Sequence, residues 1–492
     1  MDGAGVLAPK GPWFVAAAAA PADPGTWLAE LAQEAREKSI PGISVEGLAM
    51  SDAWLASLER LPALTYLDLS NTPVTDAGLG HLARCPALRH LALGMGGISA
   101  GQIAVTGAGL ARVGAVKALV SLSLSYFPAA DTDLAPLAGL PELTNLDLSG
   151  HPGVTDAGLT ALAGLARLRR LSLATTGITG TGLEGLGALP TIEDLDLSGS
   201  ALTDAGAAKL AKARRLVALR LEGAGAVTDA GLASLKGLPA LRTLALNGTA
   251  AGDATAGALA SLRTLEHLGL SNTRVGDGGV RALAELPALR ELELAHTAVT
   301  DTGVAAIARA GRLVKLDLEG CGGVTDLGAA AIAGLHHLEA LNLCACPVTD
   351  AGVASLATLS TLLDLDLTKT SITDRGLAAL ASLRSLTSLR LFRTRVGDAG
   401  MATVATLVSL ESLSLGETQV TALGLAKLRR LTRLTHLRLQ RLGIRVADLV
   451  ETLRGMKHLA SLELDRGYAQ AELAPLRAAI PGLEIAGART SR

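Results

Sequence analysis

The sequence predicts a curved α/β solenoid, a horseshoe with a parallel sheet on its concave face and helices on its convex face. A repeat of 24 or 25 residues recurs through most of the 492-residue chain. Hydrophobic residues make up 49% of the chain and aromatic residues only 2%, so the interior must consist of leucine, valine, isoleucine and alanine. Many small, similar packing layers have this composition, whereas one large irregular core does not.

Each repeat changes its apolar spacing part-way along. Leu67 and Leu69 alternate with polar residues, whereas Leu79 and Leu82 are three residues apart. Alternation is typical of a half-buried strand, and a spacing of three or four is typical of a helix face. We therefore expect a strand, a loop and a helix in each repeat. The repeats begin at Ile40, Leu64, Leu88, Leu119, Leu143, Leu168, Ile192, Leu216, Leu241, Leu265, Leu289, Leu313, Leu338, Leu362, Leu386, Leu410, Leu434 and Leu459.

A Thr-Asp-Ala-Gly signature precedes many of the expected helices. It occurs at 75–78, 155–158, 228–231 and 349–352. We expect the aspartate to accept a hydrogen bond from a free backbone N–H of the first helical turn, and so to be structural. Loss of such a cap, as in Asp229→Ala, should lower stability by about 1 kcal/mol. The aspartates expected in this role include Asp76, Asp156, Asp229, Asp301 and Asp350.

The two ends of the chain depart from the repeat. We expect a flexible tail over 1–24, an N-terminal capping helix over 25–39, a solenoid of about 18 repeats over 40–472, and a C-terminal cap over 473–492. Trp27, Leu28 and Leu31 lie on one face of the first helix. Leu473 and Leu476 begin the last one. Capping helices of this kind keep the terminal leucine layers out of water.

Charge and cysteine content narrow the function. The formal net charge is −2, which argues against a nucleic-acid partner because phosphate-binding proteins carry a basic surface. Four cysteines in so long a chain do not form the framework of an oxidised module, so we expect a reducing, cytoplasmic compartment. No apolar run is long enough to span a membrane, and residues 1–24 hold only a weak secretory pattern.

The repeat with Val-Thr-Asp-Ala-Gly-Leu resembles the leucine-rich repeats of F-box-type substrate receptors and of related bacterial proteins. The resemblance covers most of the chain and implies the horseshoe fold. It also implies a protein partner on the concave sheet and the adjoining loops. The receptor types join an F-box helical module to the repeats, but no Leu-Pro-rich F-box segment precedes Ile40 here.

Acidic residues gather on the expected central strands. One interpretation is a negative trough for a basic partner, because like charges on neighbouring strands reinforce each other. The other is that Leu-Asp-Leu-Ser is the repeat consensus and gives only a solvated face. The candidate residues are Glu291, Glu293, Asp317, Glu319, Asp364 and Asp366.

A second candidate site lies in the N-terminal third, where one repeat is about seven residues longer than the others. We expect Tyr66 to face the concave surface and the glycine-rich insertion to overhang Tyr126. The alternative is that Phe127 is a buried filler at the start of its loop and the insertion is a surface excursion. The candidate partner-binding residues are Tyr66, Met95, Ile98, Tyr126 and Phe127.

A third candidate combines arginine with an aromatic residue near the C-terminal end. Arg390, Phe392 and Arg438 have the composition of interface hot spots. The alternative is a solvated basic edge on which arginine stems cover Phe392.

Cys321 and Cys346 occupy the same position in consecutive repeats, and Cys344 precedes the second by two residues. A zinc site needs four ligands in a tetrahedral arrangement, and no suitable histidine lies nearby. We expect these cysteines to be small buried residues at the loop-start position that Thr72, Thr273 and Thr370 fill elsewhere.

No catalytic motif, metal site or cofactor site is evident in the sequence. We therefore expect a non-enzymatic, monomeric scaffold or receptor that binds a protein partner on its concave face and loop edge. The alternatives are an inhibitor that wraps around one enzyme and a secreted bacterial effector that binds a host protein.

Overall fold

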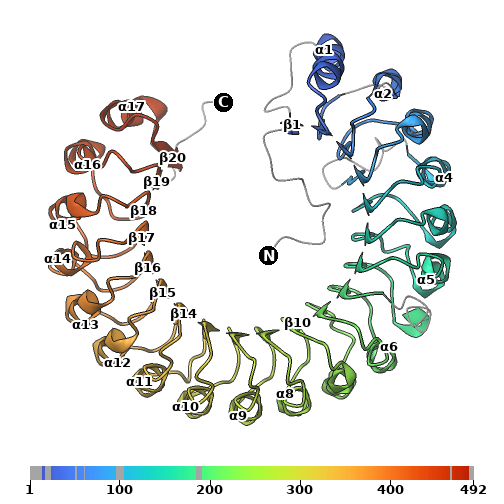
Figure 1. Ribbon diagram of the computed structural model, residues 1–492. Helices are drawn as coiled ribbons and strands as arrows, with labels where there is room; N and C mark the ends of the chain where they lie inside the picture. Colours follow the sequence, from blue (N-terminus) through green and yellow to red (C-terminus); the bar gives the residue numbers. More distant parts are fainter. Residues whose placement is uncertain are drawn as a thin grey trace. The chain divides into compact units, whose positions relative to one another are not determined.

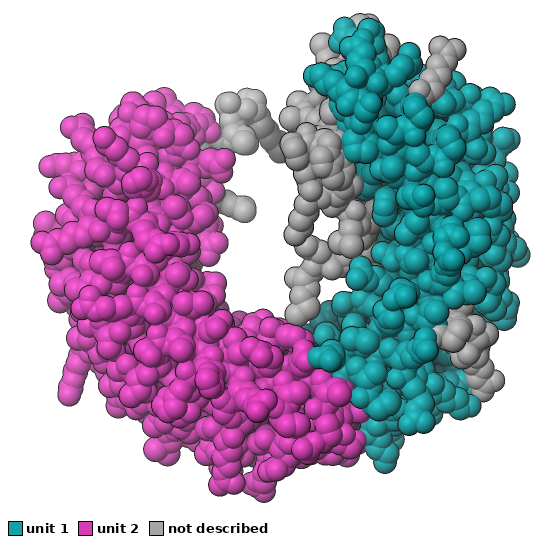
Figure 2. Space-filling model, viewed as in Figure 1, with its two compact units in different colours: residues 1–250 teal, residues 251–492 magenta. Residues whose placement is uncertain are grey.

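Short parallel strands, each followed by a loop and usually by a helix, recur through the computed structural model of the chain. The structure describes residues 14–16, 24–49, 52–59, 61–95, 105–183, 191–465 and 468–486. It divides into two units, Met1–Ala250 and Ala251–Arg492 (Figure 2). In each unit the strands lie on the inner side and the helices on the outer side (Figure 1).

Unit 1 contains ten strands among its described residues, and they pair in parallel in chain order. The strands are β1 (Phe14–Ala16), β2 (Gly42–Ser44), β3 (Tyr66–Asp68), β4 (His90–Ala92), β5 (Ser121–Ser123), β6 (Asn145–Asp147), β7 (Arg170–Ser172), β8 (Asp194–Asp196), β9 (Ala218–Arg220) and β10 (Thr243–Ala245). The α-helices are α1 (Pro24–Glu37), α2 (Asp52–Leu58), α3 (Asp76–Leu79), α4 (Gly107–Val113), α5 (Asp156–Leu162), α6 (Asp204–Leu210) and α7 (Asp229–Ala233).

Unit 2 repeats this arrangement, again with parallel pairing in chain order. Its strands are β11 (His267–Gly269), β12 (Glu291–Glu293), β13 (Lys315–Asp317), β14 (Ala340–Asn342), β15 (Asp364–Asp366), β16 (Ser388–Arg390), β17 (Ser412–Ser414), β18 (His436–Arg438), β19 (Ser461–Glu463) and β20 (Glu484–Ala486). Its α-helices are α8 (Asp253–Leu259), α9 (Asp277–Leu283), α10 (Asp301–Ile307), α11 (Asp326–Ile332), α12 (Asp350–Ser355), α13 (Asp374–Ala379), α14 (Met401–Val404), α15 (Ala422–Lys427), α16 (Val446–Leu453) and α17 (Gln470–Ala479).

The predicted strand–loop–helix repeat is confirmed, with one difference in the outer layer. Several helices end in, or are replaced by, tighter 3₁₀ turns, which suit the short outer segments. Between β5 and β6 the 3₁₀ helices η3 and η4 take the place of an α-helix. The 3₁₀ helices are η1 (Gly80–Arg84), η3 (Asp131–Asp133), η4 (Ala135–Gly139), η6 (Ser234–Gly237), η7 (Leu356–Thr358), η8 (Leu380–Ser382) and η9 (Leu428–Arg430).

The core of each unit is a stack of leucine layers. The middle residue of nearly every strand is a leucine, and the register places each one beside the leucine of the next strand. Helix leucines such as Leu79 and Leu283 complete the layers and are fully buried. Burial of one such side chain stabilises the fold by about 1.5–3 kcal/mol.

The helix starts are built differently from the prediction. Threonine, not aspartate, is the cap: the hydroxyl of Thr325 accepts a hydrogen bond from the N–H of Leu327, and Asp326 is the first residue of α11. Thr228 and Asp229 occupy the same positions at α7. The assignment of the N-cap to aspartate is therefore wrong, because the preceding threonine has the extended backbone that the cap requires.

The aspartate instead links its helix to the next repeat. Asp301 accepts hydrogen bonds from the N–H and hydroxyl of Thr325, both at 2.7 Å, and from the N–H of Gly328 at 2.8 Å. A Cβ atom at position 328 would lie 2.7 Å from the same carboxylate, which explains the glycine of the signature. We call this series of links the Asp–Thr ladder. It includes Asp76–Thr106, Asp131–Thr155, Asp204–Thr228, Asp277–Thr300, Asp301–Thr325, Asp326–Thr349, Asp350–Thr373 and Asp398–Thr421.

The ends of the chain partly match the predicted caps. The helix expected over 25–39 is α1, and the last helix and strand are α17 and β20. The prediction of a flexible tail over 1–24 is wrong at Phe14–Ala16, which pairs with β2. This pairing satisfies backbone groups at an otherwise open sheet edge. The remainder of 1–23 lies outside the described residues. Among the described helices, none combines the length and apolar character needed to cross a membrane.

Candidate functional site

The inner side of unit 2 carries two rows of polar side chains. From β12 to β16, each strand buries its middle leucine and leaves its first and third residues partly exposed. The register places Glu293 beside Asp317, and Asp366 beside Arg390. The predicted acidic trough and the predicted arginine edge therefore meet on adjacent strands. We call the first and third residues of these five strands the β12–β16 surface.

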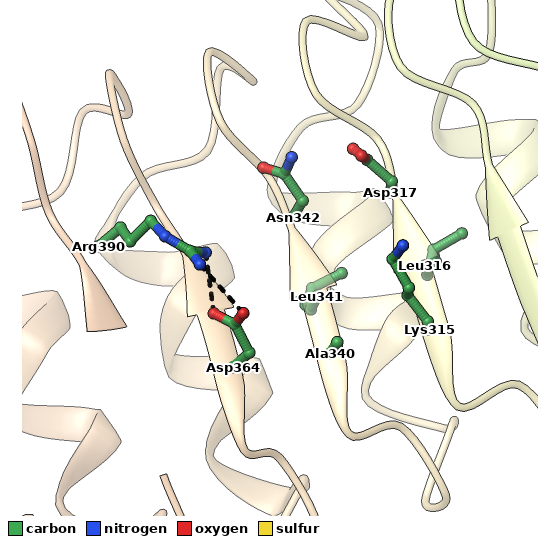
Figure 3. Close-up of a pocket in the computed structure, with 8 residues that line it drawn as sticks. All are labelled: Lys315, Leu316, Asp317, Ala340, Leu341, Asn342, Asp364 and Arg390. Carbon is green, nitrogen blue, oxygen red and sulfur yellow. Dashed lines mark hydrogen bonds and ion pairs between the residues drawn. The ribbon is translucent and has the colours of Figure 1, made fainter. Parts of the chain in front are cut away.

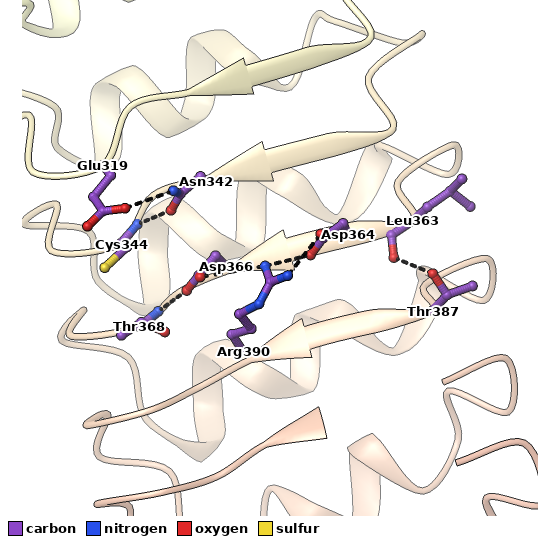
Figure 4. A network of polar contacts seen from close by, with 9 residues as sticks. All are labelled: Glu319, Asn342, Cys344, Leu363, Asp364, Asp366, Thr368, Thr387 and Arg390. Atoms are coloured by element: carbon purple, nitrogen blue, oxygen red, sulfur yellow. Dashed lines mark hydrogen bonds and ion pairs between the residues drawn. The ribbon is translucent and has the colours of Figure 1, made fainter. Parts of the chain in front are cut away.

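The third residue of several strands has a structural role. Asp317, Asn342 and Asp366 each accept a hydrogen bond from the backbone N–H two residues later, at 2.9, 2.9 and 2.8 Å. Figure 4 shows the bonds at Asn342 and Asp366. These are Asx turns, which redirect the chain where a strand ends. The same turn occurs in unit 1, for example at Asp147. The consensus interpretation therefore explains the acidic residue at the third position, but it does not explain Glu291 and Asp364, which occupy the first.

The β12–β16 surface has more acid than base. Its ten positions carry five carboxylates and two cations, a net charge of −3. Both cations are already paired. Lys315 lies 3.0 Å from Glu293, and Arg390 donates to both carboxylate oxygens of Asp364, at 2.9 and 3.2 Å. Arg390 also lies 3.6 Å from Asp366.

Asp317 differs from the other carboxylates of this surface. No basic side chain forms a close ion pair with it within the described ranges, although Lys315, which pairs with Glu293, attracts it from a longer distance. Burial raises the pKa of Asp317, and the nearby carboxylates of Glu319 and Glu293 raise it further, although hydrogen bonds oppose the shift. A raised pKa means that its surroundings stabilise the negatively charged form poorly, so a nearby cation would stabilise that form.

A hollow of about 140 Å³ opens in the middle of this surface (Figure 3). Ala340 creates it, because the neighbouring residues of the same row, Lys315 and Asp364, are much longer. The lining residues are Lys315, Leu316, Asp317, Ala340, Leu341, Asn342, Asp364 and Arg390.

Comparisons with known proteins identify the repeat. A family profile described as "Leucine Rich repeat" matches residues 61–83, 140–163, 188–211, 261–284, 286–308, 313–333, 334–357, 358–381 and 382–405. These repeats are leucine-rich repeats. The matched segments 286–308, 313–333, 334–357, 358–381 and 382–405 contain the β12–β16 surface. No curated protein matches the sequence.

Two solved structures of other proteins share the fold. An internalin from Listeria monocytogenes matches with a TM-score of 0.52 and 22% sequence identity, over 69% of this chain and 90% of its own. The TLR13–ssRNA13 complex matches with a TM-score of 0.58 and 18% identity, over 90% of this chain and 66% of its own. At these identities the similarity shows a leucine-rich-repeat solenoid and nothing finer.

The N-terminal candidate site does not present the surface that was predicted. Tyr66 is 4% exposed, and its ring packs against His90 on the next strand, with centroids 6.5 Å apart. Met95 is buried as well, at 3%. Phe127 is 1% exposed, which confirms the alternative that it is a buried filler at the start of its loop. Ile98 and the rest of the insertion, 96–104, lie outside the described residues.

Among the members of this group that the structure describes, Tyr126 is the one whose side chain is exposed, at 58%. Its backbone adopts the left-handed conformation, with φ at 56°. The ring lies over Gly150 of the next leucine-rich repeat, where a Cβ atom would come within 2.5 Å of it. One exposed aromatic side chain beside the buried Tyr66, Met95 and Phe127 is a weaker site than the sequence suggested.

The arginine edge is also less open than predicted. Arg438 pairs with Glu463 at 3.0 Å, as Arg390 does with Asp364. Phe392 is partly exposed, and its ring lies over Gly416, where a Cβ atom would come within 2.7 Å of it. Acidic residues on neighbouring strands neutralise both arginines, so this edge is not a free cationic patch.

The cysteines fill the interior as predicted. Cys321 and Cys346 are buried, and each sulfur lies 3.1 Å from a leucine carbonyl of the preceding repeat. Burial raises the pKa of Cys346 to about 12 and that of Cys344 to about 11. Thiolates are the reactive and metal-binding form, so these residues are poorly suited to either role. Across the described ranges, no three His, Cys, Asp or Glu side chains are grouped to hold a metal ion.

Five of the eight residues that line the hollow were not predicted as site residues, namely the core residues Leu316 and Leu341 and the partly exposed Lys315, Ala340 and Asn342. The repeat spacing contained the signal. Aligning the strand triplets places Ala340 between Lys315 and Asp364, a small residue between two charged ones. The prediction considered only acidic side chains on these strands, and it therefore overlooked the small residue between two charged ones.

Proposed function

We propose that this leucine-rich-repeat chain is a non-enzymatic, monomeric scaffold that binds a protein partner on the β12–β16 surface, in a reducing compartment such as the cytoplasm. The observation that carries the proposal is the charged, net-acidic surface held on a rigid sheet. Charges fixed in this way favour association with a partner of opposite charge and discriminate against others. The high pKa values of the buried cysteines support a role without a cysteine nucleophile.

The charge of the surface also bears on the class of partner. One similar structure, the TLR13–ssRNA13 complex, holds a single-stranded RNA. The β12–β16 surface has a net charge of −3 and would repel a phosphate backbone. A basic protein segment matches it better.

Charge reversal at a residue with no Asx-turn role tests the proposal. We expect the Glu291→Lys variant to lose at least tenfold in affinity, about 1.4 kcal/mol, for a partner isolated from the native cell with the unaltered chain. Glu285→Lys, an exposed residue after α9 on the outer side, is the matched control and should bind as the unaltered chain does. Equal affinity of both variants would place the partner elsewhere.

A further inference from the structure

The hollow around Ala340 is the feature of the β12–β16 surface with the most specific shape. Its floor is apolar, formed by Leu316, Leu341 and the methyl group of Ala340. Asp317 and Lys315 lie on one side of it, and Asp364 and Arg390 on the other. An apolar floor with a carboxylate on either side suits a side chain that has a hydrocarbon stem and a cationic end.

The two cations and two carboxylates that line the hollow cancel, but Glu293 and Asp366, which lie beside these cations, leave a net charge of −2 around it. Lys315 pairs with Glu293, and Arg390 pairs with Asp364 and Asp366. The carboxylate of Asp317 accepts the N–H of Glu319 and forms no close ion pair with a basic side chain of the described residues, although Lys315 attracts it from a longer distance. Arg390 shows how a guanidinium binds on this sheet, with two hydrogen bonds to a single carboxylate.

We propose that this hollow receives one basic side chain, arginine or lysine, from an extended segment of the protein partner. This inference rests on the proposed function and identifies the group that the surface recognises. The stem of the basic side chain lies over Ala340 and Leu341, and its cation pairs with Asp317. Arg390 then acts as a fixed counter-ion of Asp364 and not as a contact to the partner.

The chain itself supplies a conservative test variant. Asn342 makes the same Asx turn as Asp317, at the same 2.9 Å, so Asp317→Asn removes the charge and keeps the turn. Ala218 is the matched control for Ala340. It is the first residue of β9, lies beside Asp194 and belongs to unit 1.

The experiment uses full-length protein labelled with ¹³C at alanine methyl groups and titrated with N-acetylarginine amide and N-acetyllysine amide. N-acetylcitrulline amide, in which an uncharged urea replaces the guanidinium, is the neutral control probe. We expect the Ala340 methyl resonance to shift with at least one basic probe and not with the citrulline derivative, while the Ala218 resonance stays in place. Asp317→Asn should weaken the response at least tenfold. The two basic probes distinguish arginine from lysine.

No shift at Ala340, an equal shift with the citrulline derivative, or an unchanged response in Asp317→Asn would each overturn this inference. None of these results would affect the proposed function. That proposal is tested separately, by the affinities of the Glu291→Lys and Glu285→Lys variants for the isolated partner. Conversely, a response at Ala340 together with unchanged partner binding by Glu291→Lys would overturn the proposed function and the assignment of the basic group to the partner, and would leave only the affinity of the hollow for a basic group. With an isolated partner, Ala340→Leu should reduce affinity at least tenfold and Ala218→Leu should not.

Discussion

At the scale of single residues, the loop-start position shows how one side chain per repeat satisfies a buried carbonyl. Thr72 and Thr370 donate their hydroxyls to the leucine carbonyl three residues earlier, both at 2.6 Å. His151 occupies the same position and is 1% exposed. Its Nδ1 lies 2.7 Å from the carbonyl oxygen of Leu148, so Nδ1 carries the proton, and its Nε2 has no partner among the described residues.

This arrangement predicts a pH-dependent stability. Burial lowers the pKa of His151, which outweighs the raising effect of the nearby backbone groups and of Asp147. Below the ordinary histidine pKa the unfolded chain binds a proton that the native chain resists, so stability should fall as pH decreases below about 6.5. His151→Thr, with the residue used in other repeats, should reduce the slope of the unfolding free energy between pH 7 and 5 by up to about 1.4 kcal/mol per pH unit.

Chemical denaturation at several pH values measures this slope. His458→Thr, at an exposed position, is the control and should retain the slope of the unaltered chain. If the His151→Thr and His458→Thr proteins showed the same pH dependence, His151 would not be the buried neutral group that the geometry describes.

At the scale of secondary-structure elements, the helix starts show what periodicity predicts and what it does not. The change of spacing from two to three places strands and helices correctly, because side-chain direction follows backbone geometry. It does not decide which residue caps a helix, since threonine and aspartate are both good caps. The answer depends on the next repeat, whose Thr325 brings two donors to Asp301.

We therefore expect Asp301→Ala to destabilise the chain more than the loss of one cap would. It leaves the N–H and hydroxyl of Thr325 and the N–H of Gly328 without their acceptor, which predicts a loss of about 1–3 kcal/mol. Thermal or denaturant unfolding measures the change. Glu285→Ala, at an exposed position with no place in the ladder, should have little effect. A loss at Asp301 no larger than that at Glu285 would refute the structural role of the Asp–Thr ladder.

For the candidate surfaces, too, the sequence pattern predicted some features and not others. Alternation correctly assigned the acidic residues of β12 to β15 to the inner side, because strand geometry is local. It could not foresee that His90 packs against Tyr66, or that Arg390 pairs with Asp364 across strands. Both depend on contacts between repeats, and the same contacts produce the hollow at Ala340.

At the scale of the whole molecule, stability in each unit is a chain of nearest-neighbour contacts. Every described repeat shares hydrogen bonds and leucine layers with the repeats beside it, and the last layer in unit 2 is covered by α17 and β20. Leu473 and Leu476 of α17 are fully buried there. In such arrays an exposed terminal layer destabilises its neighbours first.

Removal of residues 468–492 should therefore loosen the adjacent repeats in order. We expect faster hydrogen exchange in β19, α16 and β18, and little change in β11 to β13. A shorter deletion, of residues 487–492, leaves α17 and β20 in place and is the matched control. Unchanged exchange in β19 and α16 after the longer deletion would show that α17 and β20 do not act as a cap.

The Asp–Thr ladder keeps neighbouring repeats aligned even where one repeat is longer than the others. Asp76 and Thr106 are 30 residues apart instead of the usual 23 or 24, yet their two hydrogen bonds, at 2.7 and 2.6 Å, match those of the regular repeats. Met95 before the extra residues and Val105 after them are both buried in the regular stack. The segment between these two anchors is thus a natural graft point, at which loops of foreign sequence and different length could be installed while the repeats on either side keep their alignment.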